Sequence, residues 1–208
     1  MFTGGKYYEK KDGTLKNIGI AFSREELECR GISVCEMKED TQTIFPGVTL
    51  YRNFERTVKY ELLNPHFFIK KEEGEHTNTY CVDKEISQIT TDEIGDMYMN
   101  DYFTDEIAVA LDTAKGLVVI VGCSHPGIMN ILTTIERRSG KKICGVVGGT
   151  HLMEADEERL KKTITGLKER NINFIAVSHC TGEGNLEKIK EIFEEKFIFN
   201  CTGNVIII

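Results

Sequence analysis

The sequence lacks any apolar run that approaches the roughly 20 residues needed to span a membrane. It also lacks the hydrophobic stretch of a secretory signal peptide at its N-terminus. Positive charge is not in excess, because 26 Lys and Arg stand against 33 Asp and Glu, for a net charge of −7. This balance argues against a nucleic-acid groove or a membrane-surface helix, which need concentrated basic residues. These absences predict a cytoplasmic protein with no nucleic acid or membrane as partner.

Ordered cysteine and glycine motifs are also missing. The seven cysteines are odd in number, are irregularly spaced and form no CxxC pair, so neither a disulfide framework nor a zinc ribbon is predicted. In a cytosolic protein most of them should be small, buried, apolar side chains. Neither GxGxxG nor GxxxxGK[ST] occurs, which excludes the Rossmann and P-loop fingerprints.

The 208 residues are enough for a single domain over residues 1–208 with a substantial core. Residues 1–105 are irregular, and short alternating runs at 31–35, 48–51 and 64–70 predict antiparallel strands. Residues 106–208 instead alternate apolar strands with amphipathic helices. A hairpin of strands 107–111 and 117–121 is followed by helix 127–138, strand 143–147, helix 155–171, strand 172–177, helix 186–195 and two short strands, 197–199 and a buried 205–208.

Three of the five histidines fall in the loops that follow the last three long strands: His125, His151 and His179. If these strands are parallel, their C-terminal loops meet on one edge of the sheet, where open α/β sheets keep their sites. With Cys123 and Cys180 beside two of them, the imidazoles offer ligands that suit Zn²⁺ or Fe²⁺. A lone histidine at a strand end is more often a hydrogen-bonded structural residue, so the clustering carries the hypothesis of a metal or catalytic site.

Thiol chemistry is an alternative use of the same loops. Cys180 lies just before a predicted helix N-terminus, where the helix dipole favours a thiolate. His179 is its immediate neighbour, however, and adjacent side chains usually diverge, which makes a poor nucleophile–base pair. Cys123 and His125 are two residues apart, a spacing that fits joint metal ligation or a Cys–His pair.

The remaining histidines and the loop glycines have less specific interpretations. His66 and His76 lie away from the three loops and are interpreted as structural or surface residues. The glycines either permit tight strand-to-helix turns or let backbone N–H groups approach an anionic substrate. This second possibility applies to Gly122, Gly148, Gly149, Gly182 and Gly184.

Five stretches of the sequence resemble one branch of the metallo-β-lactamase superfamily. Its members are labelled metal-dependent hydrolases or dihydropterin ribofuranosylaminobenzene phosphate synthases. The stretches are GLVVIVGCSHPGIMN at 116–130, VGGTHL at 147–152, SHCTG at 178–182, KNIGIAFSREEL at 16–27 and DEIAVAL at 105–111. The resemblance therefore extends over nearly the whole chain.

The resemblance implies an α/β fold of the αββα-sandwich type, with a metal site at the sheet edge and residues 106–208 as the C-terminal half. It implies His125, His179 and Cys123 as metal ligands and His151 as a substrate-facing residue or general acid. Zinc is the expected metal, with iron or manganese as alternatives. The implied reaction is hydrolysis of an ester or phosphoester of a small molecule by metal-activated water.

The chain departs from this family pattern because it contains no HxH or DH pair and therefore lacks the HxHxDH loop. We therefore expect an N-terminally incomplete, truncated form of the fold, with weak or absent metal binding and hydrolysis by this chain alone. Partners would be a small, possibly phosphorylated substrate, and an upstream fragment supplied in trans or a second copy in a homodimer. The alternative is a non-enzymatic remnant that binds an anion or a partner protein.

Overall fold

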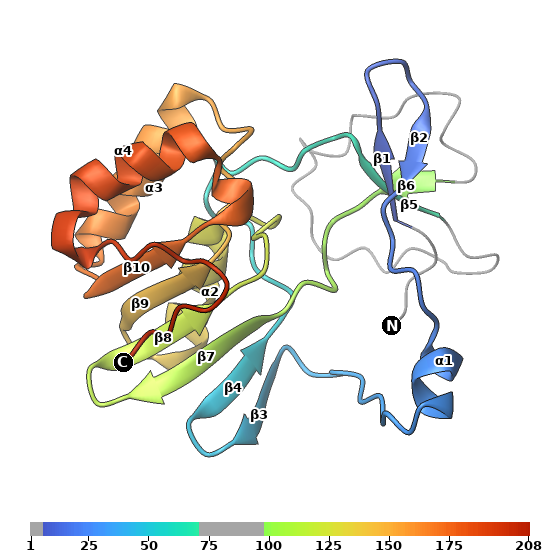
Figure 1. Ribbon diagram of the computed structural model, residues 1–208, viewed down its shortest axis with the longest axis horizontal. Helices are drawn as coiled ribbons and strands as arrows, with labels where there is room; N and C mark the ends of the chain where they lie inside the picture. Colours follow the sequence, from blue (N-terminus) through green and yellow to red (C-terminus); the bar gives the residue numbers. More distant parts are fainter. Residues whose placement is uncertain (1–5, 71–97) are drawn as a thin grey trace. The chain divides into compact units, whose positions relative to one another are not determined.

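The computed structural model describes residues 6–70 and 98–208 (Figure 1). The chain divides into two compact units, residues 1–37 with 64–102 and residues 38–63 with 103–208. Within the described ranges, no helix combines the length and the apolar character that a membrane crossing requires. The assignment of residues 1–208 to one domain, with halves 1–105 and 106–208, stays a prediction.

The smaller unit contains a four-stranded antiparallel sheet in the order β2-β1-β5-β6. Its strands are β1 (Lys6–Glu9), β2 (Leu15–Asn17), β5 (Phe67–Lys70) and β6 (Tyr98–Asn100). The helix α1 (Arg24–Cys29) begins with a capping box, in which the side chains of Ser23 and Glu26 satisfy each other's backbone N–H groups. The predicted strand at 64–70 is confirmed as β5, whereas residues 31–35 form no strand.

The larger unit contains a six-stranded mixed sheet in the order β10-β9-β8-β7-β4-β3 (Figure 1). The strands β3 (Thr41–Phe45), β4 (Val48–Tyr51), β7 (Ala108–Thr113) and β8 (Gly116–Ile120) are antiparallel neighbours. The strands β9 (Ile143–Gly148) and β10 (Phe174–Val177) continue the sheet in parallel with β8. The predicted hairpin is β7–β8, and the predicted mixed α/β fold is confirmed.

A helix follows each of the three parallel strands. These helices are α2 (Ile128–Ser139) between β8 and β9, α3 (Glu157–Glu169) between β9 and β10, and α4 (Glu183–Phe193) after the short 3-10 helix η1 (His179–Thr181). A second 3-10 helix, η2 (Glu194–Lys196), follows α4. The apolar face predicted for the first helix is confirmed, because four side chains of α2 are fully buried: Ile128, Ile131, Leu132 and Ile135.

The segment between β4 and β5 runs along α2 and is held there by buried polar side chains. The backbone N–H of Glu55 donates to Thr134 Oγ1 at 2.9 Å, and that of Val58 donates to Asn130 Oδ1 at 2.8 Å. Glu61 then accepts hydrogen bonds from two backbone N–H groups at the start of α2. These contacts fix an irregular segment that has no strand or helix of its own.

Two predictions of burial are wrong, namely that residues 205–208 form a buried strand and that most cysteines are buried. Residues 205–208 form no buried strand, since Val205 is 85% exposed and Ile207 is 93% exposed. The preceding predicted strand, 197–199, is reduced to one bridge between Phe197 and Ile175. Apolar composition does not bury a segment without a partner strand. Of the six described cysteines, two are buried and three are exposed, namely Cys29, Cys35 and Cys201.

Candidate functional site

The loops that follow β8, β9 and β10 meet at one edge of the sheet. Gly149 N donates to Gly122 O at 2.8 Å, which joins the first loop to the second. Met153 N donates to Cys180 O at 3.0 Å, and this joins the second loop to the third. The expectation that the three histidine-bearing loops gather at the C-terminal ends of parallel strands is therefore confirmed.

Each of these loops contains a non-glycine residue in the left-handed backbone region. The φ angles are 63° at Ser124, 48° at His151 and 55° at His179. This conformation is uncommon for residues with a side chain, and such strain gathers at functional sites. Ser124 is held in place by its hydroxyl, which donates to Gly149 O at 2.6 Å.

His125 and His151 lie next to each other, with ring centroids 4.6 Å apart. His125 also contacts two residues just before β7. The ring of Phe103 stacks on it at 4.4 Å with an interplanar angle of 7°, and Glu106 Oε2 lies 2.8 Å from its Nδ1. The structure thus brings together two of the three predicted histidines, with a carboxylate and an aromatic ring beside one of them.

His151 is buried, and its environment favours the neutral imidazole. Burial lowers the pKa of His151, and the neighbouring His125 lowers it further. The carboxylate of Glu154 acts in the opposite direction, with Oε2 3.6 Å from Nε2 of His151. A buried neutral imidazole is suited to hydrogen bonding with a substrate.

The two site cysteines lie in neighbouring loops. The Cys180 thiol is buried, and its Sγ donates to the backbone oxygen of Cys123 at 3.3 Å. Burial raises the pKa of Cys180 to about 12, so this thiol is protonated at neutral pH. Burial therefore opposes the use of Cys180 as an activated thiolate, which its place near a helix would favour.

His179 begins the 3-10 helix η1 and is exposed, whereas Cys123 is half-buried. Among residues 6–70 and 98–208, no group of three or more His, Cys, Asp or Glu side chains is arranged to hold a metal ion. A zinc site takes three or four protein ligands, so the described residues do not by themselves fit a complete one. The assignment of His125, His179 and Cys123 as ligands and of His151 as general acid stays a prediction.

Two histidines, His66 and His76, lie outside these loops in the sequence. His66 is exposed and pairs with Glu9, with Nδ1 3.0 Å from Oε2, which agrees with its interpretation as a surface residue. His76 lies outside the described residues.

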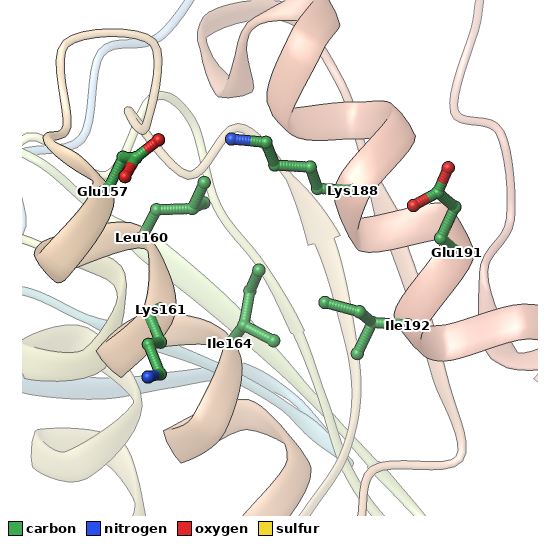
Figure 2. Close-up of a pocket in the computed structure, with 7 residues that line it drawn as sticks. All are labelled: Glu157, Leu160, Lys161, Ile164, Lys188, Glu191 and Ile192. Carbon is green, nitrogen blue, oxygen red and sulfur yellow. The ribbon is translucent and has the colours of Figure 1, made fainter.

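A groove of about 250 Å³ lies between α3 and α4 (Figure 2). Ile164 of α3 and Ile192 of α4 point toward each other across it (Figure 2). Its lining contains no histidine or cysteine and consists of Glu157, Leu160, Lys161, Ile164, Lys188, Glu191 and Ile192. The groove therefore contains none of the predicted site residues, and the candidate site remains at the loops.

Two residues of the site, Glu106 and Phe103, were not predicted from the sequence. Glu106 and Phe103 are distant from His125 along the chain, and no spacing rule connects them with it. Glu106 could have been considered as a site residue, because it belongs to the stretch at 105–111, one of the five that resemble the family. Its role became visible only through the pairing of β7 with β8.

Comparison with solved structures places this arrangement in a known fold. A metal-dependent hydrolase of the beta-lactamase superfamily superimposes on 97% of this chain with a TM-score of 0.69 and 24% sequence identity. The chain has a metallo-β-lactamase fold. The resemblance found in the sequence and the predicted fold class are thereby confirmed.

Two curated relatives come from Methanocaldococcus jannaschii. One is 7,8-dihydropterin-6-methyl-4-(beta-D-ribofuranosyl)-aminobenzene-5'-phosphate synthase, 40% identical over 107 residues, or 51% of this chain and 36% of the relative. The other is an uncharacterized protein, 33% identical over 93 residues, or 45% of this chain and 34% of the relative. No family model matches the chain.

The matched parts are shorter than the proteins to which they belong. They span about a third of each curated relative and 65% of the solved hydrolase. The names and activities given above describe those whole proteins and not this chain.

Proposed function

We propose that this chain forms the C-terminal part of a metal-dependent hydrolase with the metallo-β-lactamase fold. In its intact form the enzyme would act on an ester or phosphoester of a small molecule by metal-activated water. The observation that carries the proposal is the contact of His125 with His151 in loops at the C-terminal ends of β8 and β9. Further support is the 40% identical relative, whose name contains a ribofuranosyl 5′-phosphate.

His125, His179 and Cys123 are the proposed metal ligands, and His151 the residue that faces the substrate. Zinc is the first candidate metal and iron the second, since imidazole and thiolate ligands suit both, and manganese, which prefers oxygen ligands, is the third. The described residues contain no complete three-ligand group, and the sequence has no HxHxDH loop. We therefore propose that the chain alone binds metal weakly and has weak or no hydrolytic activity until an upstream fragment is added in trans.

The second candidate is a non-enzymatic module that binds an anion or a partner protein through the same loops. It is favoured by the missing HxHxDH loop and by the incomplete ligand set in the described residues. Metal binding distinguishes the two proposals, because a module without hydrolytic chemistry has no need to hold a metal.

The test is equilibrium dialysis of the purified protein against zinc, iron(II) or manganese, in which weakly bound metal is measured while free metal is still present. His125→Ala and His179→Ala are measured beside His66→Ala, which removes an exposed histidine from the smaller unit and serves as the control. Metal that binds to the wild type and to the control but is lost from both site variants would support the hydrolase. No metal in the wild type, or equal metal in all four proteins, would reject the proposed ligands for this chain.

Activity is measured on the same samples with bis-p-nitrophenyl phosphate as a general phosphodiester. We expect slow, metal-dependent hydrolysis or none from the chain alone. Fast hydrolysis that persists in His125→Ala would contradict the proposed site.

A further inference from the structure

Glu106 is the carboxylate around which the loop after β8 is organised. Its Oε1 accepts a hydrogen bond from Ser124 N at 2.6 Å, and its Oε2 accepts one from His125 N at 3.1 Å. The side chain of Glu106 is 13% exposed, so solvent competes little for these bonds. One side chain just before β7 therefore holds the two residues where the loop passes through the left-handed conformation of Ser124.

The same carboxylate also determines which nitrogen of the neutral His125 ring carries the proton. Glu106 Oε2 lies 2.8 Å from Nδ1 of His125. A carboxylate accepts hydrogen bonds and does not donate them, so the bond requires that Nδ1 carry the proton. In the neutral ring the lone pair then belongs to Nε2, the nitrogen that would act on a metal or substrate.

Two further contacts restrict the ring. Phe103 is buried and covers one face of the imidazole in a nearly parallel stack. The ring of His151 lies against it at an angle of 54°. The ring is therefore held by an aromatic face, a carboxylate and a second imidazole, which together leave little rotational freedom. Functional groups held in this way are already oriented before their ligand arrives.

We infer that Glu106 is a positioning residue, which holds His125 in its Nδ1–H tautomer and presents Nε2 as the acting nitrogen. The role of Nε2 toward a metal or substrate rests on the proposed function, whereas the tautomer depends only on the contacts of His125 within this chain. Carboxylates that accept from a metal-binding histidine orient the ring and raise its basicity, and their loss typically weakens metal binding about 10–100-fold.

The test is nitrogen NMR of metal-free protein labelled with ¹⁵N-histidine, with the His125 signals assigned from their loss in His125→Gln. In the wild type we expect one neutral tautomer with the proton on Nδ1. In Glu106→Ala we expect the proton to move to Nε2 in a large fraction of the molecules, because the acceptor is gone. An Nε2–H ring in the wild type, or an unchanged tautomer in Glu106→Ala, would overturn the inference.

Glu106→Gln provides a second reading if Glu106→Ala does not fold. A neutral amide oxygen is a weaker acceptor than a carboxylate, so the Nδ1 proton signal of His125 should move upfield from its wild-type position. An unmoved signal would overturn the inference. Glu154→Ala is the matched control, because it removes a carboxylate beside His151 and should leave the His125 tautomer unchanged.

Zinc titration of the same proteins separates this inference from the proposed function. We expect Glu106→Ala to bind zinc about 10–100-fold more weakly than the wild type does. A wild type that has the Nδ1–H tautomer but binds no zinc would reject the metal site and retain the positioning role. A wild type that binds zinc with a mixture of tautomers would reject the positioning role and retain the metal site.

Discussion

Replacement of Glu61 by alanine tests how the segment between β4 and β5 stabilises the larger unit. Glu61 is 4% exposed and accepts hydrogen bonds from Met129 N at 2.9 Å and from Asn130 N at 2.7 Å. These N–H groups belong to the first turn of α2, whose N-cap residue, Gly127, makes no side-chain capping bond. Glu61 thus acts as a helix cap supplied from a remote part of the chain.

The structure sets the expected size of the effect. Alanine at position 61 leaves two buried N–H groups without their acceptor, and an unsatisfied buried group costs about 1–3 kcal/mol. Removal of the buried carboxylate also relieves its own desolvation, which opposes part of this cost. We therefore expect Glu61→Ala to lower the free energy of unfolding by about 2–4 kcal/mol.

The assay is urea unfolding followed by far-UV circular dichroism, with the wild type and Glu55→Ala measured in parallel. Glu55 lies in the same segment and pairs with Arg137 on the surface, so its loss should cost less than about 1 kcal/mol. A loss below about 1 kcal/mol for Glu61→Ala, or one equal to that of Glu55→Ala, would refute the capping argument.

The pH dependence gives an independent check on Glu61. Burial raises the pKa of Glu61, while its two bonds from backbone N–H groups oppose the shift. The native state therefore holds this proton more tightly than the unfolded state does. Stability due to Glu61 falls as the pH rises from the ordinary carboxyl range through the raised value. We expect the wild type to lose stability relative to Glu61→Gln over that range, and the opposite trend would contradict the prediction.

Two further predictions concern the sheet. Gly148→Ala should lower the free energy of unfolding by about 2–4 kcal/mol, because φ is 128° there and an added Cβ would lie 2.1 Å from the backbone oxygen of Val121. We propose that the homodimer expected from the sequence forms through the edge strand β3, which has no charged residue and exposes Phe45. We expect light scattering to give a dimer for the wild type and a monomer for Phe45→Lys.

Each of these predictions has its own control or contrary result. Gly184→Ala is the control for Gly148, because a Cβ at position 184 meets nothing within 4 Å in α4 and should leave stability unchanged or slightly raised. Similar losses for both alanines would reject the steric argument. A monomeric wild type, or a dimer that survives Phe45→Lys, would reject pairing through β3.

The elements of the larger unit were predictable where a periodic apolar pattern in the sequence packs against another element of the fold. Ile128, Ile131 and Ile135 repeat at helical spacing, and all three are buried in α2. The β-branched run at 117–121 likewise became the central strand β8, which pairs on both sides. The apolar end at 205–208 has the same composition as a core strand, yet it has no strand partner and is exposed.

The sequence by itself determined the order of strands and helices between residues 106 and 195 and the placing of His125, His151 and His179 in successive loops. It could do so because hydrophobic periodicity and strand-end loops are local properties. Only the tertiary structure decided that Glu106 and Phe103 contact His125, that Glu61 caps α2 and that the Cys180 thiol is buried. The contacts of His125 and of Glu61 join residues that are 19 to 69 positions apart, and the state of Cys180 depends on burial. They therefore follow from the packing of elements and not from local spacing in the sequence.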